Sequence, residues 1–271
     1  MSRRVVLKLG GELLEGQGDL DRMAAGIADL ASRVPLVVVH GGGREIDAAL
    51  ANAGIPKVQV DGVRVTDVAT LGVVVSVLAG AINTRLVAAV RAAGARPVGL
   101  TGADAGVVSV RRAAPLAAAG GARVSLGLVG SPINNGAPQL VTDLLAKGYT
   151  PVVACIGAQK DGQLLNVNAD TLAAHLAVGL KARRLIIAGG TSGVLDETGC
   201  TIARLRAREA TRLIKQGTAS AGMVAKLQAC RSAIRGGVGD VLIVNGREAD
   251  FGGLGEPAAA AASLSCTQVV S

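Results

Sequence analysis

The stretch Val5-Val6-Leu7-Lys8-Leu9-Gly10-Gly11 decides the fold, because it joins an apolar run to a tight glycine turn. Such a β-branched run is typical of a buried strand. A helical pattern follows over residues 19–33, and the same unit recurs as Leu36-Val37-Val38-Val39, His40-Gly41-Gly42-Gly43 and a helix over residues 45–53. Repeated units of strand, glycine turn and helix predict parallel strands covered by helices.

The alternation continues to the C-terminal half of the chain. Further strands are expected over residues 95–100, 150–156, 184–188 and 240–244, hairpins over 58–67, 107–132 and 157–165, and helices over 68–78, 82–93, 138–147, 171–180, 207–216 and 220–234. The sequence therefore predicts an α/β protein: a three-layer αβα sandwich around a mainly parallel open sheet. No linker divides the 271 residues, so we expect one domain with two lobes, about 1–179 and about 180–271, ending in an apolar tail over 252–271.

The composition limits the classes of partner. The 28 lysines and arginines exceed the 20 acidic residues by 8, which suits either a solvated surface or attraction of small anionic substrates. The only aromatic residues are Tyr149 and Phe251, which argues against single-stranded nucleic acid, whose bases normally stack on aromatic side chains. We expect no nucleic-acid partner.

The cysteines and apolar runs indicate the compartment. Four cysteines occur without C-x-x-C spacing beside only two histidines, so neither a zinc site nor a disulfide framework is expected, and a reducing compartment is favoured. The basic N-terminus continues directly into strand-like sequence and lacks the features of a signal peptide. No uninterrupted apolar run approaches the roughly 20 residues of a membrane span. We expect a soluble cytoplasmic protein.

The stretch Asn166-Val167-Asn168-Ala169-Asp170 places two amides and a carboxylate directly before an apolar helix. A helix N-terminus favours negative charge, so phosphate chemistry is easily placed there. Asp170 is then expected to organise cations, either a metal ion or lysines, that bind the phosphate. The alternative is that Asp170 or Asn168 only caps the helix.

Lysine, glycine and arginine residues supply the remaining candidates. Lys8 ends a strand, where ligands bind in open α/β sheets, although it could also be a surface lysine at the sheet edge. The backbone of His40-Gly41-Gly42-Gly43 can cradle anionic oxygens, while His40 itself is expected to be a hydrogen-bonded structural residue. Lys226 lies in the first turns of a helix and can turn toward a ligand there. Arg64 suits recognition of a carboxylate, with a salt bridge at the rim as the alternative.

Five motifs in register carry a resemblance to a known family. They are Lys8-Leu9-Gly10-Gly11, His40-Gly41-Gly42-Gly43, Asp61-Gly62-Val63-Arg64-Val65-Thr66, Asn166-Val167-Asn168-Ala169-Asp170 and Gly222-Met223-Val224-Ala225-Lys226. Over nearly its whole length the chain resembles the amino-acid kinase family. The resemblance implies transfer of the γ-phosphoryl group of ATP, bound with Mg²⁺, to the side-chain carboxylate of N-acetyl-L-glutamate, which gives N-acetyl-L-glutamyl 5-phosphate in arginine biosynthesis.

The resemblance also implies roles for residues. Lys8 and Lys226 would neutralise charge on the phosphoryl group, and Asp170 would hold both lysines. Substrate binding is implied for Gly42, Gly43, Arg64 and Asn166, and phosphate or nucleotide binding for Gly10, Gly11, Gly190, Thr191, Ser192, Gly193, Ser220, Gly222 and Met223. The implied metal has no protein site of its own and is held mainly by the nucleotide phosphates.

The chain departs from the family pattern in two places. Where relatives carry Ser/Thr-Asp-Val-x-Gly at the nucleotide site, this chain has Gly189-Gly190-Thr191-Ser192-Gly193, so the contacts of the missing acid are expected from the backbone or elsewhere. Where relatives often show Gly-Lys-Asp-Gly, it has Gly102-Ala103-Asp104-Ala105, and no role is carried over to Ala103. The chain also starts at the first strand, without the N-terminal helix of arginine-regulated hexameric relatives, so a homodimer insensitive to arginine is expected.

Two other interpretations remain open from the sequence. One is a kinase for a related acyl amino acid of the aminoadipate type, because one extra methylene changes binding by only about 1–3 kcal/mol. The other is a catalytically silent ligand-binding member of the fold, which the missing acid near Gly190 suggests. The presence of Lys8, Lys226 and Asp170 together favours the enzyme.

Overall fold

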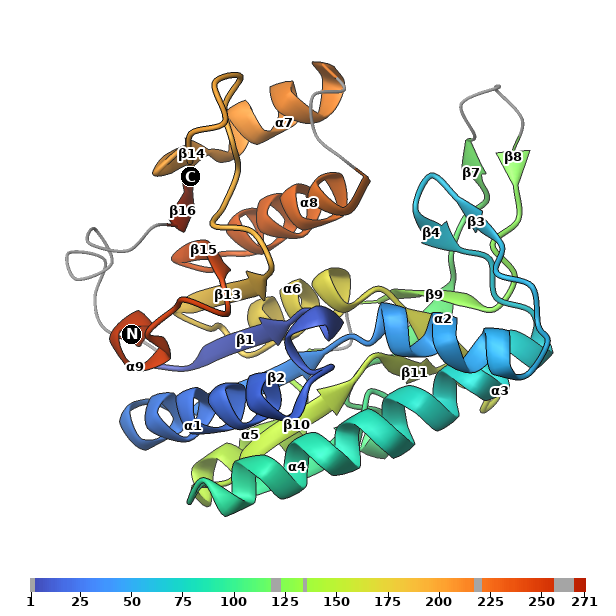
Figure 1. Ribbon diagram of the computed structural model, residues 1–271, viewed down its shortest axis with the longest axis horizontal. Helices are drawn as coiled ribbons and strands as arrows, with labels where there is room; N and C mark the ends of the chain where they lie inside the picture. The colour runs from blue at the N-terminus through green and yellow to red at the C-terminus, as the bar shows by residue number, and fades with distance from the viewer. Residues whose placement is uncertain (1–2, 118–122, 134–135, 217–220, 256–265) are drawn as a thin grey trace.

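An eight-stranded sheet forms the centre of the protein (Figure 1). The computed structural model describes residues 3–117, 123–133, 136–216, 221–255 and 266–271. Across the sheet the strands run β14 (Arg204–Arg206), β16 (Cys266–Val270), β15 (Asp240–Asn245), β13 (Arg184–Gly189), β1 (Val5–Leu9), β2 (Leu36–His40), β10 (Thr150–Ala154) and β5 (Pro97–Thr101). The strands from β15 to β5 are parallel, while β16 is antiparallel to β15. The expected mainly parallel sheet is confirmed.

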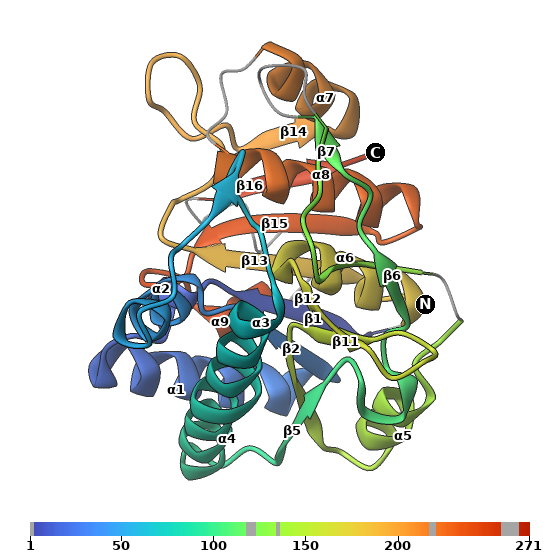
Figure 2. The ribbon, with the colours of Figure 1, turned by 90° about the vertical axis from the view of Figure 1, so that its right-hand side faces the viewer.

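Helices cover both faces of this sheet, as the two ribbon views show (Figure 2). On one face lie α1 (Gln17–Arg33), α4 (Asn83–Ala92) and α9 (Phe251–Leu254), with α1 packed on both others. On the other face lie α5 (Gln139–Ala146), α6 (Ala169–Gly179) and α8 (Ala221–Arg235), with α6 packed on α8. Connections between parallel strands are right-handed, so a connecting helix covers one face when the chain moves to the next strand on one side and the other face when it moves to the opposite side. Helices on both faces follow from this rule. The three-layer αβα sandwich is confirmed.

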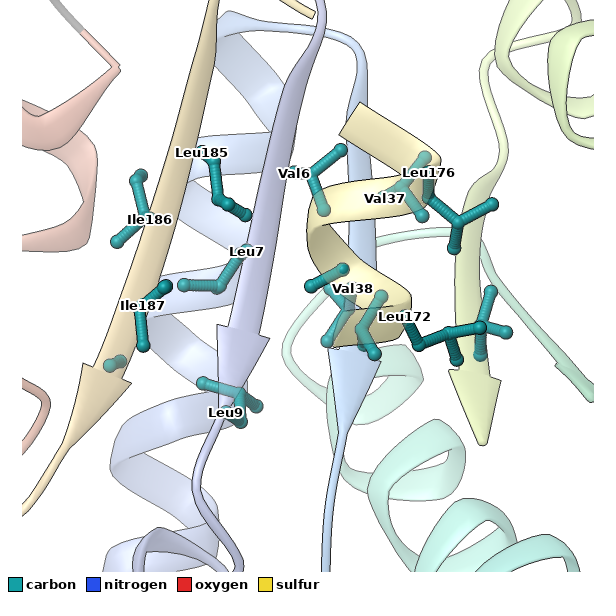
Figure 3. Close-up of a cluster of buried hydrophobic side chains, with 14 of the residues drawn as sticks. Val6, Leu7, Leu9, Val37, Val38, Leu172, Leu176, Leu185, Ile186 and Ile187 are labelled. Carbon is teal, nitrogen blue, oxygen red and sulfur yellow. The ribbon is translucent and has the colours of Figure 1, made fainter. Parts of the chain in front are cut away.

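The core forms where the apolar strands meet the helices. Every residue of β1, β2, β10 and β13 is buried, as expected for parallel strands covered on both faces. Leu172 and Leu176 of α6 lie over β1 and β2, near Val6 and Val37 (Figure 3). This packing fixes the position of the α6 N-terminus relative to the end of β1.

Smaller elements gather beyond the carboxyl ends of the central strands. A four-stranded sheet is formed by β11 (Ile156–Ala158), β12 (Leu164–Val167), β9 (Val129–Pro132) and β6 (Val110–Arg112). Two hairpins, β3 (Gln59–Val60) with β4 (Val63–Arg64) and β7 (Leu116–Ala117) with β8 (Arg123–Val124), project from the same end of the molecule (Figure 1). Gly162 turns the expected β11–β12 hairpin with φ 86°, and β12 leads directly into α6.

The two helices expected over residues 68–78 and 82–93 are one continuous run, so their separation was wrong. The run consists of α3 (Val68–Val75), a π-helical segment Ser76–Ile82 and α4. The π-helical segment spans the gap expected between residues 78 and 82, and Leu78 and Ile82 inside it are buried. By length and composition this helix could cross a membrane, but it packs on α1, β5 and α2 (Gly43–Asn52) within the sandwich.

The tail expected over residues 252–271 contains regular structure in its described part. Phe251–Leu254 form α9, and Cys266–Val270 form β16 between β15 and β14. Thr267 and Val269 of β16 are fully buried. Residues 240–244 are therefore not the last strand, and this half of the sheet is completed by the C-terminal segment and by β14, which precedes α7 (Ala207–Gln216).

Candidate functional site

Three glycine turns meet at the carboxyl edge of the sheet. β1 lies between β2 and β13, and all three strands are parallel, so the residues that follow them are neighbours. These are Gly10-Gly11 after β1, Gly41-Gly42-Gly43 after β2, and Gly190 after β13. A Cβ atom at Gly11 would lie 2.8 Å from the Cα of Gly42, so the first two turns touch and only glycine fits at position 11.

Lys8 and Asp170 form a buried ion pair beside these turns. The Lys8 Nζ lies 2.8 Å from Asp170 Oδ1, and the two side chains are only 7% and 8% exposed. Burial alone lowers the pKa of Lys8, but the Asp170 carboxylate, helped by Glu12, outweighs burial and raises that pKa above its usual value. Lys8 therefore remains an ammonium group.

At the N-terminus of α6, one residue caps the helix and a different residue forms the ion pair with the lysine. Asn168 is the N-cap, and its Oδ1 accepts a hydrogen bond of 3.0 Å from the backbone N–H of Thr171. Asp170 lies two residues further on, within the first turn, and makes the ion pair with Lys8. The two interpretations of this motif thus apply to different residues: Asn168 caps the helix, and Asp170 organises a lysine.

Lys226 approaches the same edge of the sheet from α8. Its Cε would lie 3.6 Å from a Cβ atom placed at Gly189, so the side chain runs past the end of β13. Among the described residues the Lys226 ammonium has no ion pair, whereas Asp170 pairs with Lys8. The Lys226 ammonium and the Asp170 carboxylate nevertheless both act on the Cys230 thiol. Burial and Asp170 raise the pKa of this thiol, and Lys226 opposes them. The expected pairing with Asp170 is present for Lys8 alone.

A small pocket of about 230 Å³ opens next to the second glycine turn. Its walls come from that turn, the β3–β4 hairpin and the segment from β12 into α6; they include Gly41, Gly42, Gly43, Arg64, Cys155, Asn166 and Asn168. Ligand pockets are usually about 300 Å³ or larger. The pocket therefore suits a small molecule, and it contains all four predicted substrate-binding residues.

Arg64 lines this pocket and has one unpaired nitrogen. The Arg64 side chain is 9% exposed; its Nη2 pairs with Asp47 and donates to the carbonyl of Gly43 at 3.4 Å. Its Nη1 is buried and has no hydrogen-bond partner among the described residues. A buried donor without a partner is costly, and because Nη1 is enclosed by protein, the Arg64 side chain would have to shift for this nitrogen to reach a ligand. Asn166 donates from Nδ2 to Thr66 Oγ1 at 3.2 Å, which orients its amide.

His40 supports the second glycine turn and takes no part in acid–base chemistry. It is fully buried; Nδ1 lies 3.2 Å from the carbonyl O of Gly41, and Nε2 lies 3.0 Å from Asn83 Nδ2. Asn83 Nδ2 is a donor, so Nε2 accepts and the proton sits on Nδ1. Burial lowers the pKa of His40 to about 4, which keeps the ring neutral. The expectation of a structural histidine is confirmed.

Cys155 lines the pocket but is a poor nucleophile. Its thiol donates to the carbonyl of His40 at 2.8 Å, and burial raises its pKa to about 12. The thiolate is therefore scarce at neutral pH. No local sequence pattern signals this position, because the contact joins residues 115 positions apart.

The predicted nucleotide segment divides into two parts. Gly190 lies at the site edge, followed by the exposed Thr191 and the half-buried Ser192. Gly193, with φ 145°, packs against Thr267 of β16, where a Cβ atom would clash, so it shapes the loop. On α8, Gly222 is exposed and Met223 packs against the core. Ser220 lies outside the described residues.

Sequence reasoning missed Glu12, which lies within the first glycine turn. It belongs to the short 3-10 helix η1 (Gly11–Leu13), and its Oε1 accepts a hydrogen bond of 3.1 Å from the backbone N–H of Gly190. The partners are 178 positions apart, so no local pattern signals the contact. An acidic side chain thus lies beside Gly190 although residue 190 itself is not acidic.

The acidic residues near the turns do not form a metal site of their own. The described residues contain no group of three or more His, Cys, Asp or Glu side chains that could hold a metal ion. Asp170 is committed to Lys8. Mg²⁺, which prefers several oxygen ligands, therefore fits here as a complex with nucleotide phosphates.

A larger hollow of about 440 Å³ lies apart from the turns, between α6 and α8, and its lining includes no Lys, Arg, Asp or Glu.

Comparison with known proteins places this geometry in a family. Residues 3–245 match the sequence model of the amino acid kinase family. The chain is 39% identical over 247 residues to the acetylglutamate kinase of Gluconacetobacter diazotrophicus, covering 90% of this chain and 79% of that protein. It is 40% identical over 255 residues to the acetylglutamate kinase of Caulobacter sp. strain K31, covering 90% and 83%.

A solved structure shares the fold over the full length of the chain. N-acetylglutamate synthase from Neisseria gonorrhoeae, solved with coenzyme A and N-acetyl-glutamate, superposes with a TM-score of 0.81 at 25% identity. The match covers 100% of this chain and 60% of that synthase, so the chain corresponds to only part of it. On the strength of the family match and the two kinase relatives, the chain belongs to the amino acid kinase family.

Proposed function

We propose that the protein transfers the γ-phosphoryl group of ATP to the side-chain carboxylate of N-acetyl-L-glutamate. The product is N-acetyl-L-glutamyl 5-phosphate, and the step belongs to arginine biosynthesis. One observation carries the proposal: the Lys8–Asp170 pair and Lys226 reach the same sheet edge as two touching glycine turns. Relatives about 40% identical carry the same activity in their names.

The chemistry requires charge stabilisation more than proton transfer. A carboxylate attacks phosphorus without a general base, which agrees with the neutral His40 and the inert Cys155. Phosphoryl transfer depends on positioning and on donors aimed at the charged oxygens. We assign Lys8 and Lys226 to that charge and Asp170 to positioning Lys8. The backbone N–H groups of Gly11 and Gly190 complete the cradle for the phosphates, whereas the Gly10 N–H already donates to the carbonyl of Ala188 at 2.9 Å.

The substrate's other end fits the pocket beside the second turn. The Arg64 guanidinium, which lines this pocket, would bind the α-carboxylate of N-acetyl-L-glutamate after a shift of its side chain. Asn166 and the backbone of Gly42 and Gly43 would hold the acetamido group and the attacking carboxylate. The volume of about 230 Å³ supports a substrate of this size.

The nucleotide lies, in this proposal, against the second half of the chain. We place the acyl amino acid in a lobe of about residues 1–179 and ATP in a lobe of about residues 180–271, with Gly190, Thr191, Ser192, Gly222 and Met223 near the nucleotide. Mg²⁺ would be carried by the phosphates and would neutralise part of their charge.

We propose that the protein is soluble, and we assign it to the cytoplasm.

We also propose that the chain forms a homodimer through its longest helix. From Val68 to Ala88 every exposed position of the α3–α4 run is uncharged: Val68, Ala69, Gly72, Ser76, Gly80, Ala81, Thr84 and Ala88. Only 39% of the most apolar 18-residue stretch of this helix is buried in the monomer. Small residues along one face let two helices approach closely, and an uncharged face of this length favours association over exposure to water.

An ATP-dependent hydroxamate assay tests the activity directly. We expect hydroxamate from N-acetyl-L-glutamate with the wild-type protein and a loss of about 10²- to 10³-fold in turnover in Lys8→Ala and Lys226→Ala, by analogy with removal of one charge-stabilising donor. Lys160→Ala, which changes an exposed lysine on the β11–β12 hairpin, is the matched control and should retain full activity. N-acetyl-aminoadipate is run in parallel. A preference for it would reassign the substrate, and no turnover with either would favour a silent binding protein.

A further inference from the structure

The Glu12 carboxylate lies inside the cradle that the mechanism needs for phosphates. Its Oε1 accepts from the Gly190 N–H at 3.1 Å. The same oxygen would lie 3.2 Å from a Cβ atom at Gly189, and a Cβ atom at Gly10 would overlap the carboxylate. The side chain therefore fills space that exists only because these positions are glycines.

Two lysines make this position electropositive. Lys226 Cε lies near the same Gly189 position, 3.6 Å from where a Cβ would be. The Glu12 charge also acts on Lys8, where it helps to raise the lysine pKa. Glu12 thus balances part of the positive charge of the cradle. A carboxylate oxygen and a phosphate oxygen make the same charge-assisted hydrogen bonds, so they compete for the same donors.

The backbone of Glu12 is fastened while its side chain is free to move. Arg247 donates to the carbonyl of Glu12 at 3.2 Å, and Arg85 donates to the carbonyl of Leu14 at 2.8 Å. These contacts hold the turn from both sides. Among the described residues the carboxylate itself accepts one hydrogen bond, from the Gly190 N–H, and the residue is half-buried. Rotation of the side chain can vacate the cradle without any backbone change.

We propose that Glu12 is an internal phosphate mimic that occupies the nucleotide-phosphate cradle of the free protein and must swing out when ATP binds. Glu12 is a positioning residue in this scheme, and it sets nucleotide affinity by competition. The proposal rests on the proposed function, because it requires that the cradle bind nucleotide phosphates. No covalent step is involved.

Calorimetric titration of the full-length protein with MgADP, a non-hydrolysable MgATP analogue and AMP tests the proposal. Glu12→Gln keeps an acceptor oxygen but removes the competing charge. We expect it to tighten binding of both the diphosphate and the triphosphate analogue by about tenfold, equivalent to about 1.4 kcal/mol. AMP, which lacks the β- and γ-phosphates, should change by less than about twofold. Glu12→Ala should shift affinity in the same direction as Glu12→Gln.

Glu15→Gln is the matched control, because Glu15 belongs to the same turn but pairs with Arg44 at the surface, 3.2 Å away. It should leave all three affinities unchanged. Weaker MgADP binding in Glu12→Gln, or a higher Mg²⁺ requirement, would show that Glu12 holds the metal or nucleotide and would overturn the proposal. Equal affinities in wild type and Glu12→Gln would reduce Glu12 to a structural role and overturn it too. Wild-type protein that binds no MgADP would instead remove the proposed function, and this inference with it.

Discussion

The Lys8 ammonium and the Asp170 carboxylate are in contact at 2.8 Å before any ligand is present, and both are buried. Lys226 is half-buried and has no ion pair among the described residues. Lys8→Met should therefore destabilise the fold by about 3–5 kcal/mol, because it strands a buried carboxylate, whereas Lys226→Met should cost less than about 1 kcal/mol. Both changes should reduce turnover. Urea unfolding and initial rates measure the two effects separately.

A double variant provides the control for this asymmetry. Adding Asp170→Asn to Lys8→Met removes the stranded charge and should recover much of the lost stability without restoring turnover. If Lys226→Met proved as destabilising as Lys8→Met, the two lysines would be equivalent in the fold, and the pairing described for Lys8 alone would be contradicted.

The Arg64 guanidinium is oriented by Asp47, so Asp47 should affect the acyl substrate without touching it. Hydrogen bonds from Lys57 and Arg64 outweigh burial and hold the pKa of Asp47 below its usual range, so this carboxylate is charged at neutral pH. Asp47→Asn should raise KM for N-acetyl-L-glutamate by about tenfold, a loss of about 1.4 kcal/mol, with kcat and the KM for MgATP nearly unchanged. Steady-state kinetics with each substrate varied checks the split.

Arg64→Ala should raise the same KM further, by about 100-fold, because it removes the donor itself. Arg64→Lys should rescue only part of this loss, since a single ammonium cannot reproduce the guanidinium fork. A fall in kcat with unchanged KM for either variant would instead place Arg64 in the reacting centre.

His40 gives the stability a defined pH dependence. Its pKa is about 4 in the folded protein, against the ordinary value of 6.5, so the unfolded chain binds the proton more readily. This difference in pKa contributes to the free energy of unfolding. The contribution is fully present above pH 6.5 and is lost as the pH falls toward 4, and the total loss is at most about 3 kcal/mol. Urea unfolding between pH 7 and 4.5 should show this decline.

The decline should be smaller in His40→Gln, because no imidazole remains to be protonated on unfolding. Comparing slopes between the two proteins removes the contribution of carboxylates that titrate in the same range. His175→Gln is the second comparison, since burial also lowers the pKa of His175, but less completely. Identical slopes in wild type and His40→Gln would contradict the role assigned to His40.

Features that depend on neighbouring residues were predictable from the sequence, whereas features that depend on contacts between distant residues were missed. The strand ends at Lys8 and His40 were predictable because apolar runs and glycine turns lie next to each other in the chain. Glu12 was missed, since its partner Gly190 lies in the other half of the molecule. The strand Cys266–Val270 was missed for a related reason: a five-residue segment becomes a strand only because β15 and β14 pair with it. The break expected near Gly80 failed because tertiary packing of Leu78 and Ile82 overrides the weak helix propensity of glycine.

The exposed face of the long helix predicts a dimer that charge can disrupt. Cβ atoms at Gly72 and Gly80 meet nothing within 4 Å in the monomer, so larger side chains fit there without disturbing the fold. Gly72→Glu and Gly80→Glu should convert a dimer into monomers, because like charges would face each other across the two-fold axis. Light scattering of purified protein measures the mass.

Ala25→Glu on the exposed side of α1 is the control, and it should remain dimeric. A wild-type protein that is monomeric or a stable hexamer would disprove the dimer, and strong inhibition by arginine would disprove the expected insensitivity.

The single sheet limits how the protein can close around its substrates. The ladder from Val5↔Arg184 to Leu9↔Ala188 joins the two proposed lobes through paired strand backbones, without a flexible hinge. Opening that seam would break several main-chain hydrogen bonds at once, a cost that thermal motion rarely meets. Closure around the substrates is therefore expected to leave this seam intact, and the β3–β4 hairpin, which lines the substrate pocket outside the large sheet, is the element best placed to move.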